Sequence, residues 1–335
     1  MNTIRPIRVW QKVDCALFRA EIVPLGRPAV LKGLVRDWPA VQARQKSTDA
    51  FRGYLRQFDC GASVDTSIGA PSIRGRFFYR DDMRGLNFEH RKEPLAMVID
   101  RLLANLAVED APSMYVQAAP LPECLPGFAS ENRLDLWDHN VSPRIWIGNR
   151  VQVAAHYDLS ENIACVVAGR RRFTLFPPEQ VSNLYVGPFD FTLAGTPVSM
   201  VSLDEPDFER FPRYAEALAA AEAAELEPGD ALYIPYLWWH AVKSLEPFNV
   251  LVNYWWNDAQ RTASPHHALM MASLALQGLS NEQRATWRAF FDHYIFRVNG
   301  DPLAHIPPEH HGTLGDLAPE QVHQLKMMLS NALRS

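Results

Sequence analysis

Short apolar runs dominate the middle of the chain, whereas its C-terminal part has the longer apolar spacing of helices. Runs rich in β-branched and aromatic residues, bounded by Gly, Pro or Asn, indicate strands. They cover residues 144–148, 150–158, 162–169, 171–177, 231–235 and 249–256. Many short strands around one centre predict a mainly β fold, a double-stranded β-helix of the jelly-roll kind.

The segments before and within this β-rich region have mixed patterns. Residues 28–34 have the composition of a buried strand that Gly33 interrupts near its end, and residues 114–116 predict another short strand. Apolar residues at helical spacing predict an amphipathic helix over residues 92–106. The alanine-rich residues 213–225, which follow an irregular stretch, also predict a helix.

After residue 258 the pattern becomes helical. Pro265 suits the start of a helix that extends to residue 279, and Ser280 with Gln283 forms a capping box for a second helix. Pro319 begins a third helix with an apolar face. We therefore expect N-terminal elements at 1–110, a barrel at 111–258 and C-terminal helices at 259–335. These apolar faces must be buried, either on the barrel or against a second subunit; of the two we favour a homodimer.

Composition narrows the class of protein and of partner. The 335 residues are 47% hydrophobic and 21% charged, as in globular proteins, and the net charge is −5. No nucleic-acid partner is expected, because such surfaces are normally basic. Neither a secretory signal nor a membrane-spanning run is visible, so no membrane partner is expected. The cysteines have no paired spacing, which suits a reducing compartment and predicts a cytoplasmic protein: Cys15, Cys60, Cys124 and Cys165.

Candidate chemistry centres on residues 150–158, RVQVAAHYD. Side chains alternate along a strand, which predicts His156 and Asp158 on one face and Val153 on the other. An imidazole and a carboxylate two residues apart can bind one metal ion. The spacing is weak evidence by itself, because a chain with 11 His and 38 acidic residues is expected to contain such a pair by chance.

A second histidine strengthens this interpretation. His240 follows the turn PGD at 228–230 and the run ALYIPYLWW. A histidine beside tryptophans is more often a core residue than a ligand, but a position on a later strand of the same jelly roll favours a ligand. Two imidazoles and one carboxylate form the facial triad of non-haem Fe(II) sites, which leaves positions open for chemistry. The tryptophans that could form walls of such a pocket are Trp238, Trp239 and Trp255.

A basic turn, AGRRRF, follows one strand after His156. Arg170 and Arg172 are typical of a solvated turn. Arg171 is a candidate partner for a dicarboxylate cosubstrate, because a guanidinium group matches the geometry of a carboxylate.

These motifs together resemble a known family. The combination of HYD, GRRRF with LFPP, PGD with YIP and WWH, and VNYWW is similar to the cupin-like JmjC oxygenases. PAVLKGLVRDWPA near the N-terminus is also typical, so the resemblance extends from about residue 28 to residue 256. Within the family, the likeness is nearest to the asparaginyl hydroxylase that inhibits hypoxia-inducible factor.

The resemblance implies an Fe(II)- and 2-oxoglutarate-dependent dioxygenase that uses O₂ to hydroxylate a protein or peptide side chain and releases succinate. His156, Asp158 and His240 would bind iron. Arg171 stands where the family usually has Lys, and with Tyr115 it would bind the distal carboxylate of 2-oxoglutarate. The other implied contacts are Asn162 and Asn253 near the iron-side carboxylate, and Gln117 and Trp255 near the substrate.

One departure from the family pattern concerns the cosubstrate. Val153 stands where the nearest relative has a threonine whose hydroxyl group bonds 2-oxoglutarate. That hydrogen bond is lost here, so Arg171 and Tyr115 must suffice or another group must compensate.

Other functions share these residues. The same chemistry could act on a small molecule or a modified nucleotide, and the sequence does not choose between them. A non-catalytic cupin interaction module would predict a broken triad, and a cupin isomerase or zinc hydrolase would not need a basic partner for a second carboxylate. Demethylation of N-methyl-lysine fits the chemistry, but no chromatin-reading module is visible.

Overall fold

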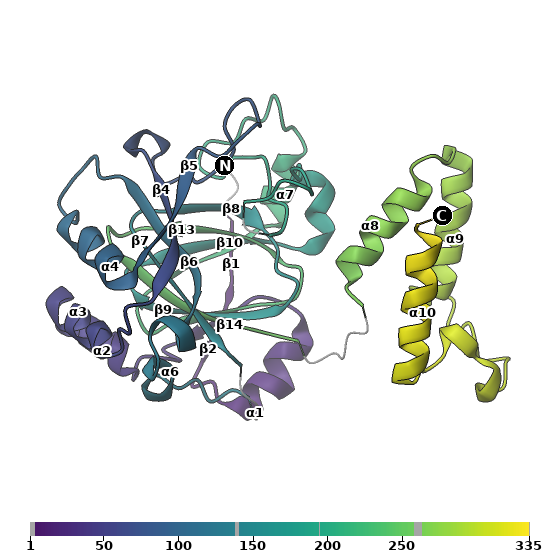
Figure 1. The fold of residues 1–335 in the computed structure, drawn as a ribbon, viewed down its shortest axis with the longest axis horizontal. Coiled ribbons are helices and arrows are strands. Elements are labelled where there is room, and N and C mark those ends of the chain that lie inside the picture. Colours follow the sequence, from purple (N-terminus) through teal and green to yellow (C-terminus); the bar gives the residue numbers. More distant parts are fainter. Residues whose placement is uncertain (1–3, 138–140, 194, 258–262, 335) are drawn as a thin grey trace. The chain divides into compact units, whose positions relative to one another are not determined.

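The strands of the central region pair into two sheets that face each other (Figure 1). The computed structural model describes residues 4–137, 141–193, 195–257 and 263–334. Within them the smaller sheet has five strands, in the order β1 (Arg5–Pro6), β11 (Glu222–Leu226), β10 (Arg171–Phe176), β13 (Trp239–Ser244) and β8 (Gln152–His156). The larger has nine described strands, β2 (Arg8–Gln11), β3 (Ala29–Lys32), β12 (Ala231–Ile234), β9 (Glu161–Ala168), β14 (Asn249–Trp256), β7 (Pro143–Gly148), β6 (Ser113–Pro120), β4 (Ser63–Gly69) and β5 (Phe88–Pro94).

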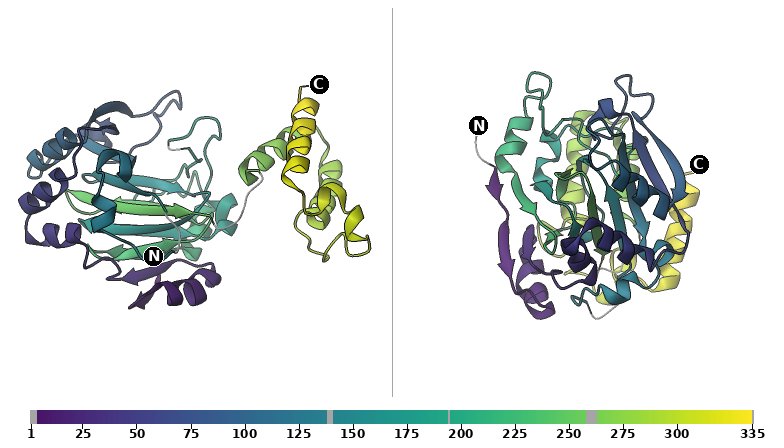
Figure 2. Two further views of the ribbon diagram at one scale, coloured as in Figure 1. Left: turned by 60° about the horizontal axis from the view of Figure 1, so that its bottom comes forward. Right: turned by 90° about the vertical axis from the view of Figure 1, so that its left-hand side faces the viewer.

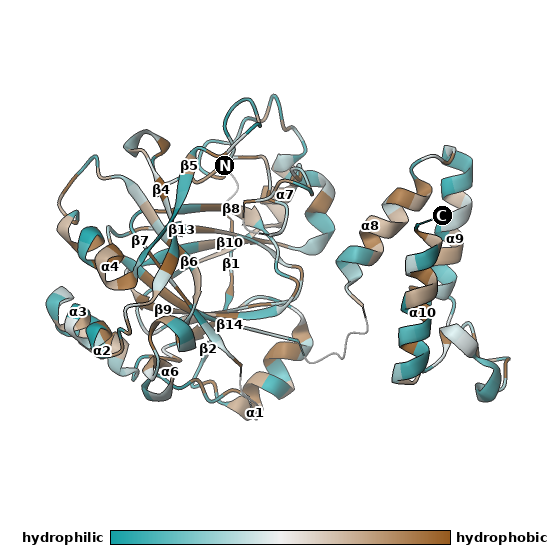
Figure 3. Ribbon diagram, viewed as in Figure 1, coloured by the Kyte–Doolittle hydropathy of each residue, from teal (hydrophilic) through white to brown (hydrophobic). Residues whose placement is uncertain are grey.

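The central strands of the larger sheet are buried on both faces. On β9, Ile163 and Cys165 join the core on the outer side of the sheet, whereas Ala164 and Val166 join the core between the two sheets. This explains why the sequence of β9 is a nearly continuous apolar run and does not alternate. The edge strand β5, FEHRKEP, is mostly exposed and appears hydrophilic along its length (Figure 3).

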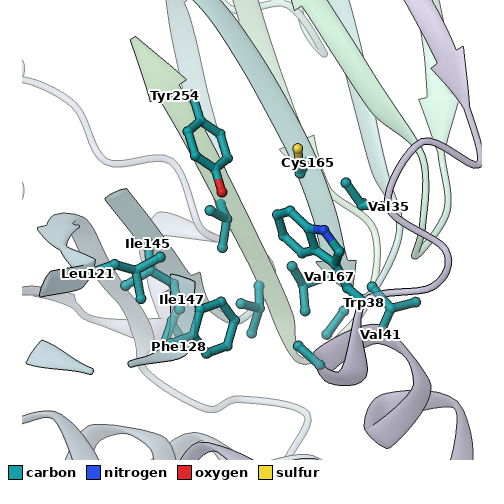
Figure 4. Packing of buried hydrophobic residues seen from close by; sticks show 14 of the residues in the cluster. Val35, Trp38, Val41, Leu121, Phe128, Ile145, Ile147, Cys165, Val167 and Tyr254 are labelled. Atoms are coloured by element: carbon teal, nitrogen blue, oxygen red, sulfur yellow. The ribbon is translucent and has the colours of Figure 1, made fainter. Parts of the chain in front are cut away.

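Helices cover the outer face of the larger sheet, in agreement between the views (Figures 1 and 2). Figure 4 shows Trp38 and Val41, at the start of one helix, against Cys165 and Val167 of β9. The α-helices that precede β7 in the chain are α1 (Cys15–Leu17), α2 (Pro39–Lys46), α3 (Thr48–Arg56), α4 (Leu95–Ala104), α5 (Leu121–Cys124) and α6 (Phe128–Glu131). A π-helical turn occurs at Phe18–Ile22, and short 3₁₀ helices occur at Val23–Leu25, Pro71–Ile73 and Pro178–Asn183.

Most of the elements expected from the sequence are confirmed, and one is wrong in part. The predicted helix at 213–225 is only α7 (Tyr214–Ala220), because the chain then enters strand β11. Strand β11 pairs antiparallel with β10, and parallel with β1 at the N-terminus. Pairing with distant strands outweighs the helix preference of alanine, and composition alone does not reveal it.

The C-terminal helices form a compact unit of their own. The chain divides into Met1–Asn257 and Asp258–Ser335, and the three-part division expected from the sequence remains a prediction. The second unit contains α8 (Pro265–Leu276), α9 (Asn281–Tyr294) and α10 (Pro319–Ala332), with short turns at Pro308–His310 and Gly312–Leu314. The predicted capping box of Ser280 and Gln283 is confirmed. Within the described part of the chain, no helix is long and apolar enough to cross a membrane.

The PGD turn at residues 228–230 holds the N-terminal strand β3 against the barrel through hydrogen bonds of Asp230. Asp230 is buried, and its carboxylate accepts hydrogen bonds from the backbone N–H groups of Gly33 and Glu227 at 3.0 and 3.1 Å. Its third partner is the Nζ of Lys32, at 2.8 Å. Gly33 has a φ of 68°, which glycine adopts without strain and which ends the strand there. Two sequence motifs that lie about 200 residues apart therefore meet at one carboxylate.

Asp230→Ala is expected to lower the free energy of unfolding by about 2–4 kcal/mol, because buried N–H groups lose a charged acceptor. Urea denaturation measures this change. Lys32→Ala is the matched control, because the Lys32 side chain is 45% exposed and an exposed ion pair contributes about 1 kcal/mol or less. Equal losses for the two variants would contradict the role given to the buried hydrogen bonds.

Candidate functional site

Two histidines lie directly opposite each other on neighbouring strands. His156 of β8 and His240 of β13 are register partners, and their ring centroids are 4.2 Å apart. The next partners are Val153 and Val242, so three steps along β8 match two along β13. This β-bulge overturns the predicted alternation: Val153 lies on the same face as His156, because opposite residues share a face.

Hydrogen bonds fix which nitrogen of each imidazole is free. The Nδ1 of His156 is 2.9 Å from the carbonyl oxygen of Ala154, and the Nδ1 of His240 is 3.1 Å from that of Trp238. A carbonyl only accepts, so each Nδ1 carries the proton and each Nε2 keeps its lone pair. Burial and the neighbouring His156 lower the pKa of His240 to about 4, which leaves this ring neutral near pH 7.

Asp158 brings a carboxylate to the two free nitrogens. Its Oδ2 is 3.6 Å from the Nε2 of His240, and ligand atoms of the three residues all lie within 4.8 Å of one another. The three predicted ligands therefore lie close enough together to bind one metal ion. Because Asp158 lies beyond the end of β8, the backbone ladder does not hold it. Its Oδ2 instead accepts hydrogen bonds from the Trp255 indole at 2.9 Å and the Asn162 amide at 3.1 Å.

The network continues across the larger sheet. The amide oxygen of Asn162 accepts from Asn253 at 3.3 Å, and the amide oxygen of Asn253 accepts from the Trp146 indole at 2.8 Å. The hydrogen bonds of Asn162, Asn253 and Trp255 thus support Asp158, and the cosubstrate and substrate contacts expected of these three residues stay predictions. Such outer partners hold a ligand in its binding orientation.

A buried cation lies in the same cavity. Arg171 is 2% exposed, and in the described part of the chain its Nε and one Nη have no hydrogen-bond partner. Its guanidinium hydrogen-bonds the hydroxyl group of Tyr115, whose pKa burial raises to about 12, so the phenol keeps its proton. Burial lowers the pKa of Arg171, but an arginine side chain remains charged in proteins. Unpaired N–H groups on a buried cation fit an anion that enters the cavity.

The triad and Arg171 share one cavity of about 110 Å³ between the sheets. It also contains Tyr115, Gln117, Asn162, Asn253 and Trp255, so every site residue predicted from the sequence lines it. Trp238 and Trp239 do not, contrary to expectation. The Trp238 indole donates to the carbonyl of Gly26, and Trp239 packs against Tyr157 on the far side of the strand.

Several residues of the cavity were missed in the sequence. Trp146 stacks on Tyr115 with ring centroids 5.7 Å apart, and it also orients Asn253. The remaining walls are apolar side chains from distant segments, among them Phe77, Phe88, Phe173, Leu193, Val198 and Leu251. Each has the sequence signature of an ordinary core residue, so no local signal could have found them.

The donor set fits the groups that the sequence implies. Two neutral imidazole nitrogens and one carboxylate suit non-haem Fe(II), and thiolates, which structural zinc sites favour, are absent from the set. The unpaired N–H groups of Arg171 suit the distal carboxylate of 2-oxoglutarate.

A comparison with protein families agrees with this geometry. The model of the cupin-like domain matches residues 15–262. The chain belongs to the cupin-like family. Its relatives are of the JmjC type, a class of 2-oxoglutarate-dependent oxygenases that includes hydroxylases and demethylases. This membership confirms the predicted jelly-roll fold. The finer likeness to the asparaginyl hydroxylase stays a prediction.

The relatives differ in their named activities. The tRNA wybutosine-synthesizing protein 5 of Danio rerio is 28% identical over 279 residues, 75% of this chain and 74% of the relative. The human bifunctional peptidase and (3S)-lysyl hydroxylase JMJD7 is 28% identical over 261 residues, 69% and 77% of the two chains. The lysine-specific demethylase JMJ31 of Arabidopsis thaliana is 33% identical over 127 residues, 38% of this chain and 23% of that protein. The match thus spans less than a quarter of JMJ31.

Trp255→Phe is expected to weaken Mn(II) binding by about 10- to 100-fold, because Asp158 loses a donor that orients it. Calorimetric titration of the metal-free protein measures this affinity. Trp238→Phe is the control, since it removes an indole hydrogen bond outside the cavity. Unchanged Mn(II) affinity in Trp255→Phe would show that Asp158 does not depend on this indole.

Proposed function

We propose that this protein is an Fe(II)- and 2-oxoglutarate-dependent oxygenase that hydroxylates a side chain of a protein or peptide. The observation that supports the proposal best is that one cavity holds both the triad and a buried arginine whose Nε and one Nη have no acceptor in the described part of the chain. A structural metal site would need the triad but not the arginine. A dicarboxylate cosubstrate needs both.

In the proposed site, each of the triad residues, Arg171 and Tyr115 has a specific role. His156, Asp158 and His240 would hold Fe(II) through the two Nε2 atoms and the carboxylate. The bound iron, 2-oxoglutarate and O₂ together supply the oxidising power: the carbon–hydrogen bond becomes C–OH, and 2-oxoglutarate becomes succinate and CO₂. Arg171 would pair with the distal carboxylate of 2-oxoglutarate, and the protonated Tyr115 hydroxyl would donate a further hydrogen bond to it.

The walls of the cavity suit this chemistry. Val153, Phe173 and Val242 place apolar surface beside the triad and Arg171, which excludes water and strengthens the charge pairing. Val153 cannot supply the hydroxyl group that a threonine would offer. The five N–H donors of the Arg171 guanidinium provide more hydrogen bonds than the lysine ammonium usual at this position, so we infer that they compensate.

A polypeptide substrate is favoured over a polyanionic one. The net charge of −5 opposes the approach of an RNA backbone, and the human relative that matches over most of both chains is named a lysyl hydroxylase. Hydroxylation of the wybutosine type of modified nucleotide, suggested by the Danio rerio relative, remains the alternative that product analysis would reveal.

His156→Ala and His240→Ala are expected to reduce succinate release to about 1% of wild type or less, because two ligands cannot hold iron in the facial arrangement. Coupled conversion of 2-oxoglutarate to succinate measures this activity. His305→Ala, at an exposed position of the C-terminal unit, should retain full activity. Wild-type succinate release by either triad variant would refute the iron site.

Arg171→Gln is expected to raise the apparent KM for 2-oxoglutarate by about 100-fold, because the distal carboxylate would lose its buried charged partner. The matched control is Arg172→Gln on the same strand, since the Arg172 side chain is 46% exposed and faces outward. Circular dichroism checks that both variants fold. An unchanged KM in folded Arg171→Gln would exclude Arg171 from cosubstrate binding.

We also propose that two copies of the chain associate through the C-terminal helices. Among the described residues of this unit, Leu303 is the one large apolar side chain that is fully buried. Many others are exposed, among them Leu269, Leu274, Trp287, Phe290, Phe296, Met328 and Leu329. Apolar surface costs free energy in water, and an interface between two copies would remove that cost.

Leu274→Glu is expected to convert the dimer to a monomer in sedimentation velocity runs, because it puts a charge into the proposed interface. Gln277→Glu adds the same charge about one turn away, at the C-cap of α8, and should change the dissociation constant less. A wild-type protein that sediments as a monomer at all concentrations would rule out this association.

A further inference from the structure

The charges that surround the cavity restrict the kind of side chain that can enter it. Asp158 is the one acidic residue among the described residues that line the cavity, and its carboxylate is already committed to the two histidines, Trp255 and Asn162. The nearest acid in the sequence is Glu161. Its carboxylate accepts from the hydroxyl group of Tyr233 on the outer side of the sheet, so it does not face the cavity.

A second cation, Arg144, lies next to the lining residue Trp255 but does not itself line the cavity, and we call this position the rim. Arg144 pairs in register with Asn253, and it precedes Trp146 by two positions on β7. It therefore lies on the same face as these two cavity residues. Its guanidinium is 5.8 Å from the ring of Trp255 and donates to the carbonyl of Ala118 at 2.9 Å. In the described part of the chain it has no carboxylate partner.

With Fe(II) and 2-oxoglutarate bound, the formal charges of the site would sum to zero. No further acidic side chain among the described lining residues would then be available to pair with a substrate cation. Fe(II) and Arg171 carry three positive charges, and Asp158 and 2-oxoglutarate carry three negative charges. A lysine ammonium that entered this neutral and mostly apolar cavity would lose its hydration and gain no partner. The guanidinium of Arg144, which has no carboxylate partner among the described residues, would also repel the lysine ammonium.

We propose that the side chain hydroxylated by this protein is uncharged, and that Arg144 is a residue that selects against lysine. The inference rests on the proposed function and narrows its substrate class. It separates this chain from the lysine-directed activities that the names of the human and Arabidopsis relatives state. Three features disfavour a lysine side chain in the cavity. They are the positive charge of Arg144, the lack of an available acidic residue among the described lining residues, and the apolar walls.

The first test identifies the target residue without assuming it. A synthetic library of peptides with randomised sequence is incubated with the Fe(II)-loaded protein, 2-oxoglutarate and O₂, and mass spectrometry locates each added oxygen atom. Added oxygen on uncharged side chains supports the proposal, whereas added oxygen on lysine, or loss of a methyl group from methyl-lysine, overturns it. If no peptide is modified and succinate release does not respond to the library, peptide hydroxylation and this inference both fail. Modified uncharged residues would uphold the proposed function together with the inference, and modified lysines would uphold the proposed function alone.

The second test measures binding without turnover. In the best peptide the target residue is replaced by lysine or by norleucine, which has a similar length and no charge. Calorimetry with the Mn(II)- and 2-oxoglutarate-loaded protein in the absence of O₂ should give norleucine an advantage of about tenfold or more. Equal affinities would overturn the proposal.

Arg144→Glu places a carboxylate at the rim and is expected to shrink this preference or reverse it. Arg284→Glu makes the same change of charge on the exposed surface of α9 and should leave the preference unchanged. If Arg144→Glu binds Mn(II) and 2-oxoglutarate normally and still prefers norleucine by the wild-type factor, Arg144 is not the selecting residue.

Discussion

The site depends on the pairing of β8 with β13, where one extra residue on β8 brings His156 opposite His240. A regular ladder would have left Val153 on the far face and given the cavity a different wall. The bulge instead gathers two imidazoles and Val153 on one side, and it coincides with the end of β8. Asp158 then follows outside the ladder, where its backbone carbonyl accepts one hydrogen bond from the N–H of Leu237 at 3.3 Å. Two side-chain donors from the larger sheet orient its carboxylate.

The two sheets contribute different parts of the site. The smaller sheet supplies His156, His240 and Arg171, and the larger supplies Tyr115 together with the chain of donors from Trp146 to Trp255. Neither sheet forms the cavity alone. Packing of the sheets against each other also removes water from Arg171, which strengthens its attraction for a carboxylate. The helices on the outer face of the larger sheet help to stabilise this arrangement, because they bury the other side of the same strands.

Family membership fixes the fold and the class of oxygenase, whereas we expect the residues that line the cavity to select the substrate. Relatives that share the cupin-like domain carry names as different as a tRNA-modifying protein, a lysyl hydroxylase and a lysine demethylase. Function in such a family is set by the residues around a shared centre. In this chain the described lining residues are mostly apolar, apart from the triad, Arg171, amides and the hydroxyl groups of Tyr115 and Thr196, and Arg144 beside them has no carboxylate partner among the described residues.

The sequence by itself identified most of the strands through local apolar patterns, and it pointed to the triad and Arg171 through several motifs that together resemble one family; the structure brings these residues into one cavity. It also identified the capping box at Ser280, whose partner lies within a few residues, and the PGD turn, but not the contacts that Asp230 makes with Lys32 and Gly33. Only the tertiary structure decided the face of Val153, the strand at Glu222–Leu226 and the exclusion of Trp238 from the cavity. Each of these depends on pairing with a distant strand, and the pattern of one segment carries no information about its partner. Trp146 was missed for the same reason, since an inward-facing tryptophan has the same local sequence whether it packs in a core or lines a site.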